Sequence, residues 1–218
     1  MPVFRLNSGS HEFPDPELAD GSGLLAVGGD LSVGRLVRAY RSGIFPWYDP
    51  GETIHWWCPR TRFVIFPEEI HVSRSLKKTL KAGRYEIVFN RDFAGVIAGC
   101  RAMREGNTWL GDEMEAAYTE LFRNGLAMCA EARAGDGLAG GLYGVSIGKC
   151  FFGESMFSKA PDASKAALVG LCRMLADEGY VFVDCQFRTP HLEKMGGRHI
   201  SWEAYISLLE NGLAARAR

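Results

Sequence analysis

Residues 126–157 (LAMCAEARAGDGLAGGLYGVSIGKCFFGESMF) decide the fold, because they contain three consecutive strand patterns separated by turn signals. Segments 126–133 and 138–147 flank Asp136-Gly137, a dipeptide typical of tight hairpin turns. Gly148 then allows a second turn into segment 149–157. The stretch therefore predicts an antiparallel meander.

The segments on either side of this meander mix helical and strand patterns. Before it we expect strands at 63–66 and 85–89 and helical segments at 73–81, 93–100 and 114–122. After it we expect a long helix at 162–178, an apolar strand at 180–187 and a closing helix at 201–210. This order predicts the α+β class, with an N-acetyltransferase-like mixed sheet flanked by helices over residues 62–218. The assignment is a topological analogy and carries no function by itself.

Residues 1–61 have a different composition, rich in Gly, Pro and Trp, and predict a small N-terminal α/β domain. One helix is clear here. Asp30 or Ser32 can cap it, Tyr40 belongs to its apolar stripe, and Gly43 ends it.

Composition excludes several classes of protein. The 218 residues are 47% hydrophobic and 23% charged, which suits a globular protein with a sizeable core. No apolar run approaches the ~18 residues of a membrane span, and the N-terminal residues lack the layout of a signal peptide. The six cysteines are scattered without a Cys-x-x-Cys pair. We therefore expect reduced thiols, no metal site and a cytoplasmic location.

Charge is uneven along a nearly neutral chain. The formal net charge is −1, yet residues 61–108 carry nine basic and five acidic side chains. Within that segment Arg74, Lys77, Lys78 and Lys81 fall on one helical face, with Arg84 nearby. Such a face is usually solvated, but it could also hold the phosphates of a polyanion.

The apolar strand 180–187 contains two polar side chains. Because side chains alternate along a strand, Asp184 and Gln186 are expected on one face and Cys185 on the other. A carboxylate in so apolar a strand is costly unless it has a partner. Asp184 is therefore either functional, at a strand end that opens onto a cleft, or a structural anchor for a loop.

Glu154 interrupts a second apolar strand in the same way. Alternation places it on the same face as Met156, which would offer a charged and an apolar contact together. The alternative is a buried structural pair, for which Lys165 is the nearest basic choice in the following helix.

Aromatic residues and absent motifs narrow the function further. Trp47 and Trp109 could pack in the core or stack on a nucleobase, which contributes ~1–3 kcal/mol per base. No phosphate-binding Gly-x-x-x-x-Gly-Lys-Ser/Thr loop is present, so nucleotide hydrolysis is unsupported. The turn at 158–164 lacks the Gly-rich amides that would cradle coenzyme A pyrophosphate.

Several runs of this sequence occur together in one known family. They are Gly-Leu-Leu-Ala-Val-Gly-Gly-Asp-Leu (23–31), Gly-Ile-Phe-Pro-Trp-Tyr (43–48), Trp-Trp-Cys-Pro (56–59), Gly-Gly-Leu-Tyr-Gly (140–144), Gly-Glu-Ser-Met-Phe-Ser (153–158) and Asp-Cys-Gln (184–186), followed by His191-Leu192. In this order they resemble the bacterial leucyl/phenylalanyl-tRNA–protein transferases. The resemblance covers roughly residues 13–200.

The resemblance implies an activity and its partners. Members transfer Leu or Phe, with Met left open as a third donor, from aminoacyl-tRNA to proteins that begin with Arg or Lys. The product is marked for N-degron degradation. The resemblance also implies that coenzyme A, metal and ATP are not used. The alternatives are a coenzyme-A-dependent N-acyltransferase and a non-catalytic peptide- or RNA-binding protein.

The resemblance also implies roles for individual residues. Gln186, polarised by Asp184, would accept the proton of the attacking amine, and a route through water is equally compatible with the sequence. Glu154 would attract the cationic acceptor. The remaining roles are apolar contacts to the donor side chain (Met156, Phe152, Leu142), a frame for the terminal adenosine (Trp47, Trp109, Tyr40, Tyr118) and phosphate contacts (Arg74, Lys77, Lys78, Lys81, Arg84).

Overall fold

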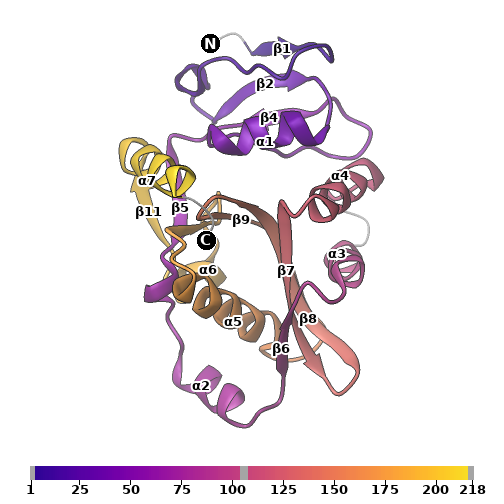
Figure 1. Cartoon of the computed structure of the whole chain (residues 1–218), viewed down its shortest axis with the longest axis vertical. Coiled ribbons are helices and arrows are strands. Elements are labelled where there is room, and N and C mark those ends of the chain that lie inside the picture. The colour runs from indigo at the N-terminus through magenta and orange to yellow at the C-terminus, as the bar shows by residue number, and fades with distance from the viewer. Residues whose placement is uncertain (1–2, 104–107, 216–218) are drawn as a thin grey trace.

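The computed structural model describes residues 3–103 and 108–215, and its larger sheet forms the centre of the molecule (Figure 1). The seven strands of this sheet lie in the order β11-β5-β10-β9-β8-β7-β6. Their bounds are β5 (Thr61–Ile65), β6 (Glu86–Phe89), β7 (Ala127–Ala134), β8 (Gly137–Ile147), β9 (Cys150–Ser158), β10 (Phe182–Asp184) and β11 (Arg198–Ser201).

The predicted meander is confirmed. β7, β8 and β9 pair antiparallel in sequence order, and Gly148, with φ of 60°, forms the turn between β8 and β9. Helix α5 (Ala163–Asp177) then returns the chain so that β10 lies parallel to β9, with Val183 opposite Phe151. An antiparallel meander followed by a helix and a parallel strand confirms the predicted α+β class and the N-acetyltransferase-like mixed sheet.

Helices cover both faces of this sheet. On one face α5 contributes buried side chains such as Leu168, and α2 (Arg74–Lys81) contributes Leu76 to the same cluster. The other face is covered by α3 (Phe93–Ala102), α4 (Asp112–Arg123) and α7 (Trp202–Ala214). The sheet is therefore the middle layer of three.

A second, four-stranded sheet precedes the larger one in the chain and lies above α4 and α7 in the view of Figure 1. Its order is β1-β2-β4-β3, and α1 (Val33–Arg41) connects β2 to β3. The strands are β1 (Phe4–Leu6), β2 (Leu24–Gly28), β3 (Phe45–Pro46) and β4 (His55–Trp57). The predicted boundary between residues 61 and 62 falls at the start of β5. A single apolar cluster nevertheless spans both sheets: it includes Tyr40 and Trp56 on one side and Tyr118 and Phe152 on the other.

The C-terminal part differs from the predicted elements in three respects. The strand expected over 180–187 ends at Asp184, and Gln186 adopts a left-handed conformation with φ of 58°. The closing helix α7 begins after Ser201, whose hydroxyl accepts a hydrogen bond from the Ala204 amide. A short helix, α6 (Pro190–Lys194), and the edge strand β11 follow β10, and neither was predicted.

Candidate active site

Glu154 lies in a β-bulge of strand β9. In the β8–β9 pair, Tyr143 lies opposite Ser155 and Gly144 opposite Gly153, so Glu154 has no partner on β8. A Cβ atom on Gly144 would collide with the backbone oxygen of Phe152, so glycine is required beside the bulge. The extra residue interrupts the alternation of side chains, and the prediction that Glu154 and Met156 share a face is wrong.

Two buried tyrosines hold the Glu154 carboxylate. The Tyr40 hydroxyl donates to Oε1 and the Tyr118 hydroxyl to Oε2, each at 2.7 Å, and the two hydroxyls lie 2.9 Å apart. Burial raises the pKa of Glu154 to about 7, although the hydrogen bonds from Tyr118 and Tyr40 lower it. The alternative pair with Lys165 is wrong, because Lys165 pairs with Asp162 at 2.7 Å.

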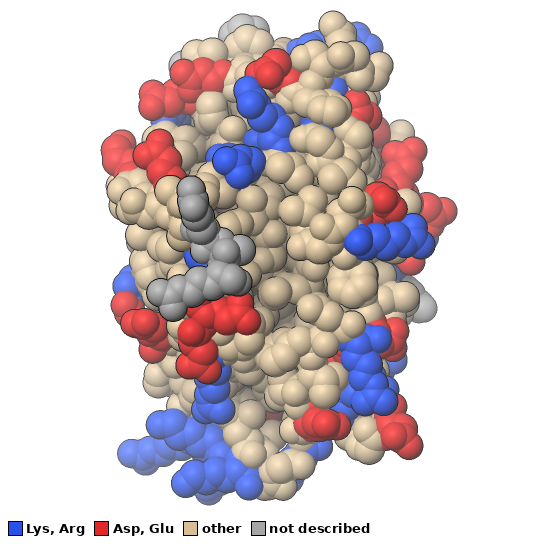
Figure 2. All heavy atoms as spheres, viewed as in Figure 1, with Lys and Arg blue, Asp and Glu red and all other residues tan. Residues whose placement is uncertain are grey.

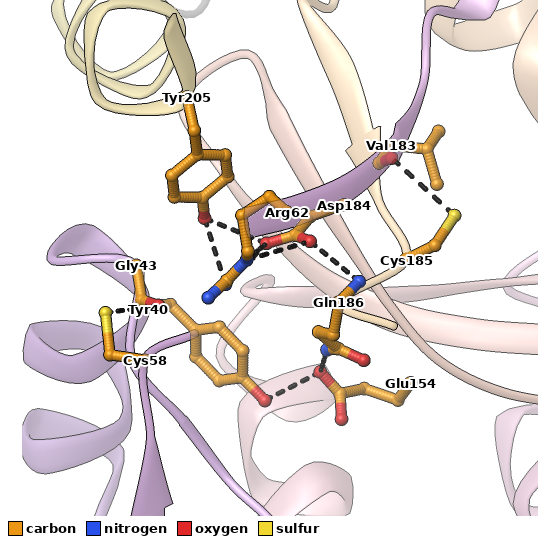
Figure 3. A network of polar contacts seen from close by, with 10 residues as sticks. All are labelled: Tyr40, Gly43, Cys58, Arg62, Glu154, Val183, Asp184, Cys185, Gln186 and Tyr205. Atoms are coloured by element: carbon orange, nitrogen blue, oxygen red, sulfur yellow. Dashed lines mark hydrogen bonds and ion pairs between the residues drawn. The ribbon is translucent and has the colours of Figure 1, made fainter. Parts of the chain in front are cut away.

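Asp184 belongs to a different, fully buried cluster (Figure 3). Arg62 Nη2 and the Tyr205 hydroxyl donate to Asp184 Oδ2 at 2.7 and 2.8 Å, and Arg62 Nε approaches both carboxylate oxygens at 3.2–3.3 Å. Burial lowers the pKa of Arg62, but the neighbouring Asp184 carboxylate outweighs this, so the pKa is raised. These contacts support the interpretation of Asp184 as a structural anchor, because its carboxylate fixes the loop that carries Gln186.

Gln186 connects the two clusters. Its backbone N–H donates to Asp184 Oδ1 at 2.8 Å, while its side-chain Nε2 donates to Glu154 Oε1 at 3.3 Å (Figure 3). The expected contact, in which Asp184 polarises the Gln186 side chain, is replaced by a contact to the backbone. The reason is that β10 ends at Asp184, so strand alternation does not extend to residue 186.

A cavity of about 650 Å³ opens beside Glu154 and Gln186. Its wall is mostly apolar and includes the predicted residues Leu142, Met156, Trp47 and Trp109. Cys185, expected to point away from Gln186, also lines it. A volume of this size is typical of small-molecule sites.

Three residues predicted to contact substrate lie elsewhere. Tyr40 and Tyr118 are 1% and 0% exposed, and their hydroxyls face Glu154, so framing an adenosine is incompatible with their positions. Phe152 is fully buried and packs against Tyr40, with ring centroids 5.1 Å apart. It precedes the bulge, whereas Met156 follows it, and the two side chains therefore join opposite faces of the sheet.

Aromatic side chains surround the mouth of the cavity. Trp47 is 42% exposed and Phe187 is 39% exposed, with ring centroids 5.4 Å apart. Trp57 donates its indole N–H to the Trp47 backbone oxygen and lies 5.8 Å from the Trp47 ring. Large aromatic faces that remain exposed at a cavity mouth are available to stack on a ligand.

The predicted basic face forms on α2. Ser73 caps this helix by accepting a hydrogen bond from the Leu76 amide, and Leu76 and Thr79 are buried beneath it. The five predicted side chains are all exposed, and within the described part of the chain none of them pairs with a carboxylate: Arg74, Lys77, Lys78, Lys81 and Arg84. Figure 2 shows Lys and Arg side chains gathered at the end of the molecule where Figure 1 places α2.

The described ranges 3–103 and 108–215 contain no group of three or more His, Cys, Asp or Glu side chains that could hold a metal ion. All six cysteines are free thiols. No helix in these ranges is both long and apolar enough to cross a membrane.

Sequence reasoning missed Arg62, Tyr205 and Phe187. A signal for Arg62 existed, because it is the one Lys or Arg between residues 61 and 73 and stands next to an apolar run. Asp184 is likewise an isolated acid in a second apolar strand. Two isolated opposite charges in neighbouring apolar strands predict a buried pair. No comparable signal marks Tyr205, which lies in an ordinary amphipathic helix.

An apolar cavity with a carboxylate of raised pKa in its wall is typical of an enzyme active site. Comparison with known proteins is more specific. A family model described as leucyl/phenylalanyl-tRNA protein transferase matches residues 64–210, and the N-terminal domain model of that family matches residues 29–60. This chain belongs to the leucyl/phenylalanyl-tRNA–protein transferase family.

Individual relatives agree with this assignment. Over 212 residues the chain is 50% identical to the leucyl/phenylalanyl-tRNA–protein transferase of Pseudomonas putida (strain W619), covering 95% of this chain and 94% of the relative. Over 192 residues it is 54% identical to the protein of that name from Nitrosomonas europaea, covering 86% and 81%. A solved structure of a conserved protein from Bacteroides thetaiotaomicron aligns with a TM-score of 0.45 at 10% identity, covering 62% of this chain and 53% of that one, which is too weak to support a conclusion.

Proposed function

We propose that the chain is an aminoacyltransferase that moves Leu or Phe from the 3′ ester of an aminoacyl-tRNA to the α-amine of a protein beginning with Arg or Lys. One observation carries the proposal: a single cavity of about 650 Å³ has a largely apolar wall that also contains a carboxylate and an exposed tryptophan side chain. An aminoacyl-tRNA is already an activated ester, so the site has to orient two substrates and needs no nucleotide hydrolysis. Orientation can contribute ~7–11 kcal/mol to lowering a barrier.

The donor is assigned to the apolar and aromatic parts of the wall. Leu142, Met156 and Leu168 surround space suited to a branched or aromatic side chain. Trp47 and Trp109 line the same cavity and are assigned to the terminal adenosine. An apolar pocket separates side chains that differ by a methylene only modestly, so a Met donor is compatible with this site.

The acceptor is assigned to the polar side of the cavity. Among the described residues that line the cavity, Glu154 has the one carboxylate, and it attracts the cationic N-terminus of a protein that begins with Arg or Lys. A charge-assisted hydrogen bond to such an amine contributes about 1.5–3 kcal/mol. The negative charge of the cavity wall also favours an acceptor whose first side chain is cationic over one whose first side chain is acidic.

The body of the tRNA is assigned to α2. Its exposed basic side chains would contact phosphates, which position a nucleic acid without reading its sequence. Thr79 joins α2 to the start of α5 through a 3.1 Å hydrogen bond to Asp162, and α5 carries Leu168 in the cavity wall. Helix α5 thus connects the basic face of α2 to the wall of the cavity. Because the donor is a charged tRNA, we place the reaction in the cytoplasm, where it would mark acceptor proteins for N-degron degradation.

A transfer assay tests the proposal. Purified protein is mixed with tRNA charged with labelled Leu or Phe and a peptide that begins with Arg, and the label should appear in the peptide without ATP. A peptide of the same sequence beginning with Asp serves as the matched acceptor control, and acetyl-coenzyme A serves as the rival donor. Label in the Asp peptide, or acetylation without aminoacyl transfer, contradicts the proposal.

A further inference from the structure

We propose that Glu154 takes the proton from the acceptor amine, and that Asp184 is a positioning residue that fixes the backbone of Gln186. This inference rests on the proposed transfer reaction and assigns its proton acceptor. It differs from the sequence-based expectation, in which Gln186 polarised by Asp184 accepts that proton. Three features of the structure carry it.

The first feature is that the Asp184 carboxylate is already fully engaged. It is 0% exposed and does not line the cavity. Oδ2 accepts from Arg62 and Tyr205, and Oδ1 accepts from the backbone amide of Gln186. A proton on Asp184 would break the buried pair with Arg62 and leave that guanidinium without its counter-charge.

The second feature is the orientation of the Gln186 side chain. Its Nε2 donates to Glu154, and the contact with Asp184 is made by the backbone. The Asp184 charge therefore reaches the Gln186 side chain through no direct hydrogen bond. A neutral amide is not a base near pH 7, so Gln186 is suited to orienting a neighbouring group rather than to holding a proton.

The third feature is the environment of Glu154. The groups that face it are Tyr40 from α1, Tyr118 from α4 and Gln186 from the loop after β10, with the Asp184 charge beyond. All three hydrogen bonds are donated to the carboxylate, and the side chain lines the cavity. Its pKa of about 7 lies close to the ~7.7–8.0 of an α-amine, which is the match that efficient proton transfer requires.

The proposed step takes two protons from the acceptor nitrogen. The Glu154 carboxylate removes one proton from the acceptor ammonium, and the neutral nitrogen attacks the ester carbonyl carbon to form the C–N bond. As the carbon–oxygen bond to the tRNA breaks, the departing 3′ oxygen takes the proton held by Glu154. The second proton lost by the nitrogen goes to the Glu154 carboxylate and from there to solvent.

The pH dependence of kcat tests this assignment. With saturating aminoacyl-adenosine and Arg peptide, kcat should rise with pH through about 7 as the carboxylate forms. Glu154→Gln should lower kcat by ~10²–10⁴-fold and replace that rise by the one the amine itself gives at ~7.7–8.0. With an aminooxy analogue of the peptide, whose attacking nitrogen is neutral at pH 7, the loss of kcat should shrink to a few fold. A residue that only binds the acceptor would instead change KM.

Tyrosine variants provide a second test that does not depend on the folding of Glu154→Gln. Tyr118→Phe removes one donor to the carboxylate and should move the rise in kcat upward by about one pH unit. Tyr205→Phe removes one donor to Asp184 and should leave the midpoint of the rise in place. Tyr85→Phe removes a remote hydroxyl, which donates to the Pro161 backbone oxygen, and is the matched control.

Two results would overturn the inference. One is an unchanged pH profile in both Glu154→Gln and Tyr118→Phe. The other is a profile that moves with Tyr205→Phe, which would make Asp184 the titrating group. Failure of the transfer reaction itself looks different, because the unaltered protein would then move no label to the Arg peptide at any pH.

Discussion

The Asp184 carboxylate accepts a hydrogen bond from the backbone N–H of Gln186 at 2.8 Å, whereas the Gln186 side chain donates to Glu154 at 3.3 Å. The two carboxylates therefore contact different parts of Gln186: Asp184 accepts from its backbone and Glu154 accepts from its side chain. The buried one sets the left-handed backbone at φ of 58°, and the one in the cavity wall sets the direction of the amide. This division explains why the two acids should respond differently to substitution.

Asp184→Ala should affect stability as well as turnover. It leaves Arg62 buried without its partner, and breaking such a pair costs about 3–5 kcal/mol. Urea denaturation should show this loss in the free energy of unfolding, whereas the exposed control Asp49→Ala should change it by less than ~0.5 kcal/mol. Equal values for the two variants would remove the structural role of Asp184.

Gln186 should matter for turnover and little for tRNA affinity. Gln186→Asn keeps an amide and tolerates positive φ, but it is one methylene too short to reach Glu154 as Gln186 does. We expect kcat to fall at least tenfold (about 1.4 kcal/mol), with tRNA binding unchanged in a filter assay. Near-normal kcat at saturating substrate would show that the amide has no role in the reaction.

Trp47 is expected to act on the donor alone. Loss of a stacking ring costs ~1–3 kcal/mol per base, so Trp47→Ala should raise KM for aminoacyl-adenosine by roughly 5–150-fold. The KM of the Arg peptide should stay the same. Phe89→Ala, which removes an exposed ring distant in sequence from the cavity residues, is the control. A matching rise in peptide KM would instead place Trp47 beside the acceptor.

The basic face of α2 should control the salt dependence of tRNA binding. Neutralising Lys77, Lys78 and Lys81 together should weaken binding to all tRNAs alike and reduce the slope of log K against log salt by roughly 0.7–0.9 per lost contact. Arg5→Gln, on β1 at the opposite end of the molecule, should leave that slope unaltered (Figure 1). A slope insensitive to the triple variant would mean that this face is merely solvated.

Glu154 should also make stability depend on pH. Its pKa is about 7 in the folded protein against an ordinary value of 4.5, so between these values the folded state binds the proton more tightly. Stability from this group is therefore present below about pH 4.5 and is lost as pH rises through 7. Relative to the unaltered protein, Glu154→Gln should gain on the order of 2–3 kcal/mol between pH 5 and pH 8. A difference that is the same at both pH values would contradict the raised pKa.

The sequence predicts the larger sheet well because its signals are local. Hydrophobic periodicity and turn dipeptides define β7, β8, β9 and α5 without reference to distant residues. The N-terminal strands escape prediction because they are two to five residues long, too short for an alternating pattern to stand out.

The site is predicted less completely because its decisive features are not local. Glu154, Gln186, Leu142 and Met156 are found by looking for polar interruptions and apolar neighbours. The bulge at Glu154 depends on the register of two strands, and the Arg62–Asp184 pair joins residues 122 positions apart. Neither can be derived from the spacing within one segment.

The apolar cluster that joins the two sheets limits how the two parts of the chain can be separated during evolution. Severing the chain after β4 would expose Leu36, Tyr40 and Trp56 on one piece, and Tyr118 and Phe152 on the other. Each piece would present an apolar patch that a soluble monomer rarely tolerates. We therefore do not expect recombination to transfer the four-stranded sheet by itself to an unrelated enzyme. A substitution in this apolar cluster affects the packing of both sheets. We therefore expect the residues that the two sheets contribute to the cluster to change together.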